Sequence, residues 1–293
     1  MARRKVHVYD EKGIKESMGL TGRRIIAHTV LIFLSLLCLF WFYMLFINCT
    51  RTNAEISTGF SWLPGTNFIK NWTNLKNGSI DIFTGLRNSA FIAIASAAFC
   101  VYFSTLTAFA IHAYNFPGKN AIYTFILMVM MIPTQVTSLG FVKLCRDMDL
   151  ESSFLPIILP SIAAPVTFFY LKQYMDSSLS LSLIEAARID GSSEFRTFNK
   201  IVLPLMKPAI AVQAIFTFVS SWNNYYVPSL LLTKEEKKTL PILIAQLRAS
   251  DWQTFDMGKV YMCIAFSIFP VIIVYLLLSK FIVAGVALGG VKE

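Results

Sequence analysis

Residues 185–208 read EAARIDGSSEFRTFNKIVLPLMKP, and the rest of the chain is organised around this stretch. It is rich in charged and small residues, and long apolar segments lie on both sides of it. An apolar stripe at helical spacing runs into it and consists of Leu179, Leu183, Ala186 and Ala187. Gly191 then stands where a chain that leaves a helix needs a positive φ. The pattern predicts a short amphipathic helix that ends in a bend at Gly191.

A second short helix is predicted after the bend. Ser192 can cap its start, and Glu194 lies in its first turn, where a negative charge favours the helix N-terminus. Apolar side chains then recur on one side of the helix, namely Phe195, Phe198, Ile201 and Val202. Pro204 is expected to end this helix, and Pro208 suits the first turn of the next one. The stretch therefore predicts two amphipathic helices at a membrane surface, shaped to enter a concave partner.

The same stretch carries a resemblance to a known family. Its Glu-Ala-Ala triplet, its Asp-Gly pair and the later Leu-Pro and Lys-Pro pairs match, in order and spacing, the EAA loop of ABC importer permeases. The matching residues are Glu185, Ala186, Ala187, Asp190, Gly191, Phe198, Ile201, Leu203, Pro204, Lys207 and Pro208. Over residues 25–293 the chain resembles most the carbohydrate-importer permeases of the maltose-permease type. It departs from them at Ser180-Leu181-Ser182, where the family often has a Pro-Lys or Pro-Glu pair.

This resemblance implies a fold, a function and partners. The fold is the all-α, MetI-like fold of type I ABC importer permeases, with a cytoplasmic coupling loop at residues 176–207. The function is the ATP-driven import of a sugar or oligosaccharide. The partners are an ATP-binding subunit dimer, a second homologous permease subunit and an extracytoplasmic sugar-binding protein. Glu185 would be the ionic anchor on the ATPase, Ala186 and Ala187 the close-contact surface, and Gly191 the bend. The alternative is a solvated amphipathic loop without a partner.

Composition independently places the chain in a membrane. Its mean hydropathy is +0.59, with 55% hydrophobic and only 15% charged residues, which lies outside the range of soluble proteins. Six segments without Asp, Glu, Lys or Arg are long enough to cross a bilayer, for which about 20 residues are needed. They are residues 25–49, 88–111, 121–142, 154–171, 208–232 and 260–279. We therefore expect six spanning helices in contact with membrane lipid, preceded by a polar tail at residues 1–24.

The basic residues indicate an orientation. With six spans, 15 of the 26 Lys and Arg residues fall on the side of the N-terminal tail, and cytoplasmic segments carry the excess of such residues. We therefore expect a multi-pass membrane protein with both termini in the cytoplasm, and the resemblance implies that the membrane is the bacterial plasma membrane. The same distribution explains the net charge of +9, because the cations are spread over many segments. Nucleic-acid binding is not expected.

The fifth expected span contains the second informative stretch, SSWNNYY at residues 220–226. Uncharged polar side chains within a membrane are costly unless they face protein or a water-filled path. If the span is one helix, Ser220, Asn223, Asn224 and Val227 share a face, and Trp222 and Tyr226 lie on another. Amides can bond sugar hydroxyls and rings can stack on a pyranose, so the five polar and aromatic residues of this set are candidates for a substrate path. An aromatic belt at the outer interface is the alternative for Trp222 and Tyr226.

Two further amides are candidates for the path. Gln135 lies beside Pro133, which should kink the third span, although helix–helix hydrogen bonding is the commoner role for such an amide. Asn88, at the outer end of the second span, resembles the Asn-Ser pair that begins this span in the family. A satisfied interfacial amide is an equally good interpretation of Asn88.

Several classes of protein are disfavoured. The chain has no G-x-x-x-x-G-K-[ST] loop, so ATP hydrolysis is expected on a separate subunit, and the chain itself is not expected to be an enzyme. Its five cysteines have no metal-type spacing, and neither a metal nor a cofactor is expected. Two alternatives stay open. An ABC permease for a non-sugar solute would favour a charged path, and an ion-coupled secondary transporter would favour an ionisable residue at membrane depth.

Overall fold

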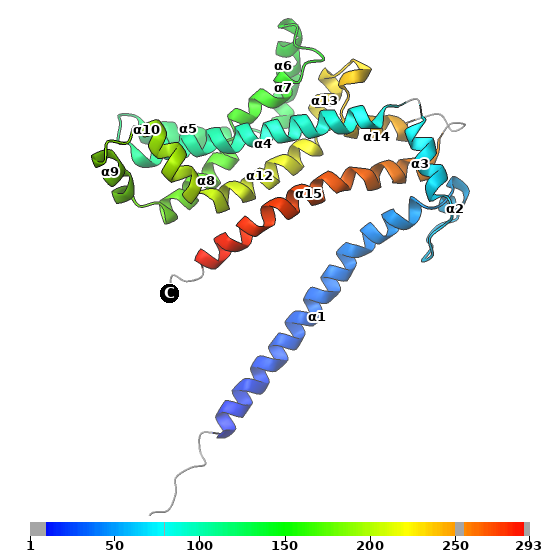
Figure 1. The fold of residues 1–293 in the computed structure, drawn as a ribbon, viewed down its shortest axis with the longest axis horizontal. Coiled ribbons are helices and arrows are strands. Elements are labelled where there is room, and N and C mark those ends of the chain that lie inside the picture. Colours follow the sequence, from blue (N-terminus) through cyan, green and yellow to red (C-terminus); the bar gives the residue numbers. More distant parts are fainter. Residues whose placement is uncertain (1–9, 79, 250–254, 290–293) are drawn as a thin grey trace, which may run out of the picture. The chain divides into compact units, whose positions relative to one another are not determined.

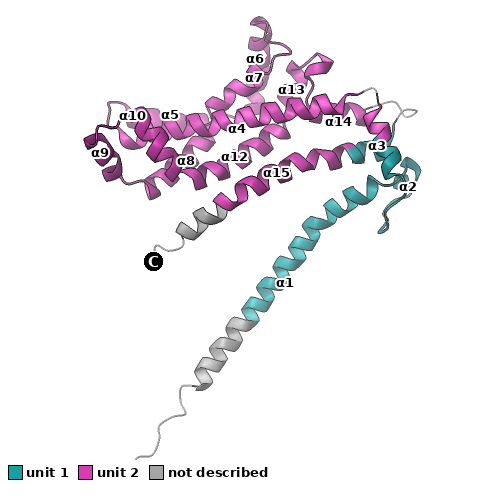
Figure 2. Cartoon of the chain, viewed as in Figure 1, with its two compact units in different colours: residues 1–72, 256–262 teal, residues 73–255, 263–293 magenta. Residues whose placement is uncertain are grey.

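The computed structural model describes residues 10–78, 80–249 and 255–289, and every regular element within these ranges is a helix. The chain divides into two compact units (Figure 2), residues 1–72 with 256–262 and residues 73–255 with 263–293. The first unit contains α1 (Asp10–Asn48) and α2 (Asn53–Ser57). α3 (Phe68–Lys76) and α15 (Met257–Gly289) each have residues in both units. An all-α chain agrees with the predicted fold class.

The second unit carries the remaining helices (Figure 1). They are α4 (Ile82–Ala113), α5 (Lys119–Val129), α6 (Thr134–Asp147), α7 (Leu155–Ile158), the 3₁₀ turn η1 (Leu159–Ile162), α8 (Pro165–Ser178), α9 (Leu181–Ile189), α10 (Glu194–Thr197), the π-helical turn η2 (Phe198–Val202), α11 (Leu203–Leu205), α12 (Lys207–Trp222), α13 (Tyr226–Leu231), the 3₁₀ turn η3 (Glu235–Lys237) and α14 (Leu240–Arg248).

Four stretches are long and apolar enough to cross a membrane: Gly22–Asn48, Ile82–Ala113, Leu155–Ser178 and Met257–Phe281. They correspond to the first, second, fourth and sixth expected spans. Two bent helix pairs would raise the number to six. One of them, α5 with α6, is the third expected span, and it is broken by 94°. Pro133 lies at this break as the residue that precedes α6, as its ring and missing N–H predict.

The helix that contains the first expected span is longer than predicted. α1 begins at Asp10, so the helix includes much of the stretch that the sequence analysis assigned to a polar tail. Residues 1–9 lie outside the described part of the chain. The second span also starts earlier than expected, because Asp81 caps α4 by accepting a hydrogen bond from the Thr84 N–H at 3.1 Å.

The fifth expected span is not one helix. α12 ends at Trp222, and α13 starts at Tyr226 after a break. A continuous helix would place the ring of Pro228 against the carbonyl of Asn224 and would remove one hydrogen bond, which explains the break. The prediction that Ser220, the two asparagines and Val227 share one face of a single helix is therefore wrong.

The core of the second unit lies where α4 packs against α8 and α12. One apolar cluster there is formed by side chains from α4, α8 and the segment that follows α8. The buried members are Ala108, Phe109, Ile111, Phe168, Leu171, Met175, Leu179, Ile184, Phe198, Val202 and Met206. The last three of these belong to residues 185–208, and this stretch is therefore anchored in the core of the unit by its own apolar residues.

Candidate functional site

The first candidate site is the segment formed by α9, α10, η2 and α11, residues 181–205, which we call the elbow segment. Its bend is at Gly191, whose φ is +75°. The Gly191 N–H bonds the Arg188 carbonyl at 3.0 Å, and the Ser192 N–H bonds the Ala187 carbonyl at 2.9 Å. This is the Schellman pattern that closes a helix through a left-handed residue. The predicted conformation of Gly191 is confirmed.

The second helix of the elbow segment starts one residue later than predicted. Ser193, and not Ser192, is the cap, and its hydroxyl accepts a hydrogen bond from the Arg196 N–H at 3.4 Å. Ser192 instead accepts a hydrogen bond from the Thr197 hydroxyl at 3.0 Å. Ser192 is part of the Schellman pattern that ends α9, because its N–H bonds the Ala187 carbonyl. Ser193 is therefore the first residue that can serve as the N-cap of α10.

Pro204 does not end this helix, contrary to the prediction. The chain stays helical to Leu205, because the turn before the proline is π-helical and bonds the Leu203 N–H to the Phe198 carbonyl. This wider turn leaves room for the proline ring beside the preceding turn of backbone. It also changes which side chains face inward. Phe198 and Val202 are fully buried, whereas Phe195, predicted on the same side, is 68% exposed.

A cluster of charge holds the two arms of the elbow segment together across the bend. Arg188 Nε donates to Glu194 Oε1 at 2.7 Å, and the Tyr114 hydroxyl donates to Glu194 Oε2 at 2.5 Å. The Arg188 guanidinium also lies over the Tyr114 ring, 5.2 Å from its centroid. Hydrogen bonds from Arg188 and then from Tyr114 lower the pKa of Glu194, and Glu194 in turn raises the pKa of Arg188. The bend is therefore braced against the end of α4.

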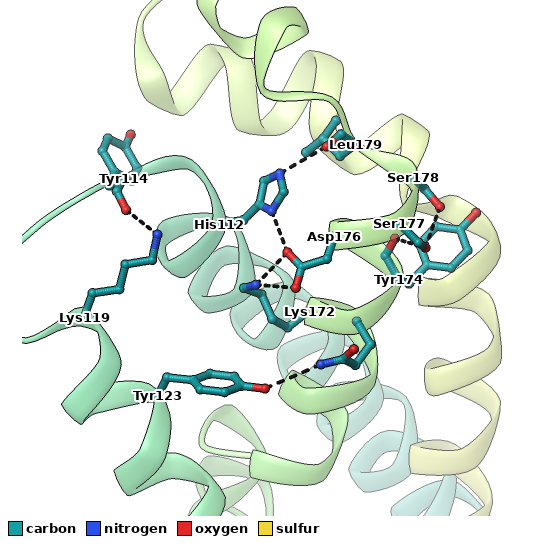
Figure 3. A network of polar contacts seen from close by, with 11 residues as sticks. His112, Tyr114, Lys119, Tyr123, Lys172, Tyr174, Asp176, Ser177, Ser178 and Leu179 are labelled. Carbon is teal, nitrogen blue, oxygen red and sulfur yellow. Dashed lines mark hydrogen bonds and ion pairs between the residues drawn. The ribbon is translucent and has the colours of Figure 1, made fainter.

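A second polar cluster lies where α8 leads into the elbow segment (Figure 3). His112 Nδ1 is 2.8 Å from Asp176 Oδ1, and His112 Nε2 is 3.1 Å from the Leu179 carbonyl. Lys172 pairs with the same carboxylate at 2.5 Å. His112 and Tyr114 both belong to the end of α4, so one short stretch contacts α8 and both arms of the elbow segment. Sequence reasoning missed this arrangement, because its members are far apart in the chain.

The predicted docking residues divide into three groups by exposure. Glu185, Ala186, Asp190, Gly191 and Pro204 are exposed, Ile201 and Leu203 are half-buried, and Ala187 and Phe198 are buried. Ala187 therefore packs inside the chain, which departs from the close-contact surface implied by the resemblance. Two exposed apolar residues were missed, Ile189 at 86% and Phe195 at 68% exposure. They flank the bend, and Ile189 could have been found as the apolar residue outside the stripe of α9.

The second candidate site is a cavity of about 330 Å³. Its lining combines hydroxyls, one amide and apolar surface: Thr134, Thr137, Ser138, Phe141, Pro156, Ile157, Pro160, Asn224 and Val227. No charged side chain belongs to this lining. The Thr137 and Ser138 hydroxyls donate to backbone carbonyls of their own helix, at 3.1 and 2.7 Å. Their oxygens still have lone pairs to accept hydrogen bonds from a ligand.

Of the seven predicted path residues, only Asn224 lines this cavity. Ser220, Asn223, Tyr226 and Gln135 are exposed outside it, and Trp222 is 3% exposed and stacked on Phe218. The α6 residues that do line it were missed. They are Thr134, Thr137, Ser138 and Phe141, whose spacing of three, four and seven residues marks one helical face. That signal was in the sequence, although it was hidden by reading 121–142 as one span.

Asn88 has the structural role that the sequence left open. It is buried, and its amide donates to the carbonyls of Glu236 and Lys238 at 2.9 and 3.0 Å. The neighbouring Ser89 hydroxyl accepts from the Leu240 N–H at 2.8 Å. The Asn-Ser pair therefore fastens the loop between α13 and α14 to α4, and the charged start of that loop is held by its backbone.

Comparison with known proteins gives a consistent family. The profile of the family described as "Binding-protein-dependent transport system inner membrane component" matches residues 101–287. The arabinooligosaccharides transport system permease protein AraQ of Bacillus subtilis (strain 168) is 34% identical over 265 residues, covering 88% of this chain and 92% of the relative. The sn-glycerol-3-phosphate transport system permease protein UgpE of Salmonella typhi is 30% identical over 278 residues, covering 93% and 98%.

A solved structure shares the fold. It is a chain from a bacterial ABC transporter involved in the import of the acidic polysaccharide alginate. The TM-score is 0.76 at 23% sequence identity, and the match covers 94% of this chain and 99% of that one.

Proposed function

This chain belongs to the family of binding-protein-dependent transport system inner membrane components, and we propose that it passes a sugar or oligosaccharide through an ATP-driven importer. It is a transport subunit rather than an enzyme. In the proposed assembly, an extracytoplasmic binding protein delivers the solute, a second homologous permease completes the path, and an ATPase dimer supplies the energy. Both termini and the elbow segment lie on the cytoplasmic side.

The elbow segment is the surface that docks on the ATPase. The observation that carries this assignment is the contrast between its two sides. Phe198 is fully buried in the core, while Ile189 and Phe195 expose apolar surface on the two sides of the bend and Glu185 is exposed on α9. A rigid helix pair with apolar anchors and an exposed charge suits insertion into a groove.

Movement of the docked elbow segment would reach the spanning helices through the polar clusters. The Arg188–Glu194–Tyr114 cluster joins both arms of the bend to the end of α4, and His112 joins the same end to α8. A pull on the elbow segment would therefore act on α4 and α8 together. In this mechanism, closure of the ATPase dimer rocks the helices between inward-facing and outward-facing states.

The cavity beside α6 is the proposed contact with the solute. Hydroxyl and amide oxygens can accept hydrogen bonds from sugar hydroxyls, and the Phe141 ring offers an apolar face. The absence of a cation from the lining favours a neutral sugar over an anion. A neutral solute would distinguish this chain from its relative named for sn-glycerol-3-phosphate transport.

The test of ATPase docking uses Ile189, which is 86% exposed and therefore has little effect on folding. Ile189→Asp should abolish copurification of an ATPase subunit and sugar uptake, because a carboxylate would be buried without a partner at the interface. Ile189→Val keeps an apolar side chain and should retain both. Equal membrane yield and thermal stability of the two variants is the control. Full copurification with Ile189→Asp would exclude the assignment.

A further inference from the structure

The turn at residues 59–64, Gly-Phe-Ser-Trp-Leu-Pro, folds back along α1, and we call it the aromatic turn. The Phe40 ring lies 5.9 Å from the Phe60 ring and 6.1 Å from the Trp62 ring, between centroids. Tyr43 lies 6.2 Å from the Trp62 ring, and its hydroxyl donates to the Trp62 carbonyl. Phe40 precedes the end of α1 at Asn48 by about two helical turns, or ~12 Å at 1.5 Å per residue. The turn therefore reaches back to the depth of the apolar helix.

Several backbone groups of the aromatic turn have hydrogen-bond partners within the chain. The Gly59 carbonyl accepts from Arg51 Nη1 at 2.9 Å, and the Trp62 carbonyl is bonded as described. The Ser61 hydroxyl donates to the Leu63 carbonyl and accepts from the Leu63 N–H, both at 3.1 Å. Such partners lower the cost of placing irregular backbone near lipid. Arg51, which is only 6% exposed, is the inner support of the turn.

The side chains of the aromatic turn are apolar and exposed. Trp62 is 63% and Leu63 75% exposed, and no charged residue occurs between Glu55 and Lys70. The adjoining surface of α1 has the same character, since Trp41 is 68% exposed. The exposed surface of the turn is thus continuous with a helix surface that suits lipid.

We propose that the aromatic turn is a membrane-interface anchor, embedded at the boundary of headgroups and acyl chains in the leaflet where α1 ends. Trp and Tyr rings favour this level of the bilayer, because one end of each ring is apolar and the other can form hydrogen bonds. The occupant of this surface is lipid. A second permease subunit or an extracytoplasmic protein is the competing occupant, and the inference does not depend on the transported solute.

The test measures which probe reaches the turn in a bilayer. The full-length chain, with the subunits that copurify, is reconstituted in liposomes after Cys38→Ser removes the exposed native thiol. A spin label is placed at Leu63→Cys, with Leu39→Cys of α1 as the lipid reference and Ala54→Cys of α2 as the exposed polar-loop reference. The collision rate of the spin label with oxygen, which concentrates in lipid, is then compared at the three positions with its collision rate with a water-soluble nickel chelate.

The expected result is oxygen access at position 63 close to that at position 39, with nickel access well below that at position 54. Low access to both probes would mean that protein covers the turn, and high nickel access would mean water, and either result would overturn the proposal. A label-free check uses fluorescence quenching by lipids brominated near the headgroup. The brominated lipids should quench a larger share of the tryptophan fluorescence in the native chain than in the Trp62→Phe variant. Equal quenching in the two chains would contradict the anchor.

Discussion

The elbow segment and the polar stretch 220–226 both interrupt an apolar chain, yet the structure of the first was predicted from sequence much better than that of the second. The elbow segment was predicted as two helices and a bend, and the structure has both helices and the bend at Gly191. The polar stretch was predicted as one face of a helix, and the structure has a break instead. Local signals decided the first region, since a glycine and caps act over a few residues. The second depended on whether a helix continues, which periodicity alone does not show.

The two regions also differ in how they use burial. The elbow segment buries Phe198 and Val202 and leaves its functional candidates exposed. In the polar stretch the residue with the strongest sugar-binding character, Trp222, is buried against Phe218, and only Asn224 reaches the cavity. Residue type therefore indicated that both regions matter, but not which side chains are available to a partner.

The largest expected effect comes from Phe198→Ala in the elbow segment. The Phe198 ring lies 5.6 Å from the rings of Tyr102 and Phe109, and its removal should cost about 3–5 kcal/mol of stability through lost packing and a cavity. Phe195→Ala, three residues away and exposed, should change stability by less than about 0.5 kcal/mol. Thermal unfolding in mild detergent measures both, and similar losses would contradict the division of the segment into buried and exposed sides.

The next effect is expected at the bend. Gly191→Val places a β-branched residue at a φ of +75°, which costs about 1–2 kcal/mol. A Cβ would meet no atom within 4 Å, so the effect is conformational and not a clash. Uptake should fall strongly while ATP hydrolysis by the assembled importer continues.

Gly191→Asn is the matched control, because asparagine tolerates this conformation. It should retain most of the uptake. If the valine variant transports normally, the bend has no coupling role.

A smaller effect is expected in the cavity. Asn224→Ala removes one ligand hydrogen bond worth about 0.5–1.5 kcal/mol, so the KM of uptake should rise about two- to tenfold. Asn223→Ala is the neighbouring control, since Asn223 is exposed and its amide bonds the Val219 carbonyl. Its KM should stay near the native value. A larger increase in KM for Asn223→Ala than for Asn224→Ala would exclude the cavity as the substrate path.

The smallest effect is expected from pH acting on the brace of the elbow segment. The pKa of Glu194 is lowered, so its ionised form contributes stability above the ordinary carboxyl range and loses it only as the pH falls through the lowered value. Between about pH 6 and 8 the carboxylate stays ionised. Uptake by the native chain and by Glu194→Gln should therefore vary in parallel over this window. A pH-dependent difference between them would place the titration of Glu194 within it.

Much of the fold could be predicted because the relevant signals are local or compositional. The charge-free segments predicted the spanning regions, Pro133 predicted the break of the third, and Gly191 predicted the bend. Two local predictions failed because an adjacent turn of backbone changed the role of the residue. Ser192 lost its role as a cap because its N–H closes the preceding helix, and Pro204 stayed in a helix because a π-helical turn precedes it.

The candidate sites were predicted in part. The exposed face of the elbow segment contains Glu185, Ala186 and Asp190 as expected, whereas Ala187 and Phe198 turned inward. Asn88 proved to be a structural amide, and the hydroxyls of α6 were missed although their helical spacing was present. Their grouping with Asn224 depends on the break after Met130, which redirects α6.

The sequence by itself determined that this chain is helical, lies in a membrane, and carries a glycine-centred elbow between two apolar regions. Hydropathy, missing charges and a residue that tolerates positive φ suffice for that, because each acts through short-range chemistry. Only the tertiary structure decided which residues are exposed, which are buried, and which polar groups meet. Tyr114 reaches Glu194 and His112 reaches Asp176 across long intervals of chain, and such contacts follow from how helices pack and not from local spacing.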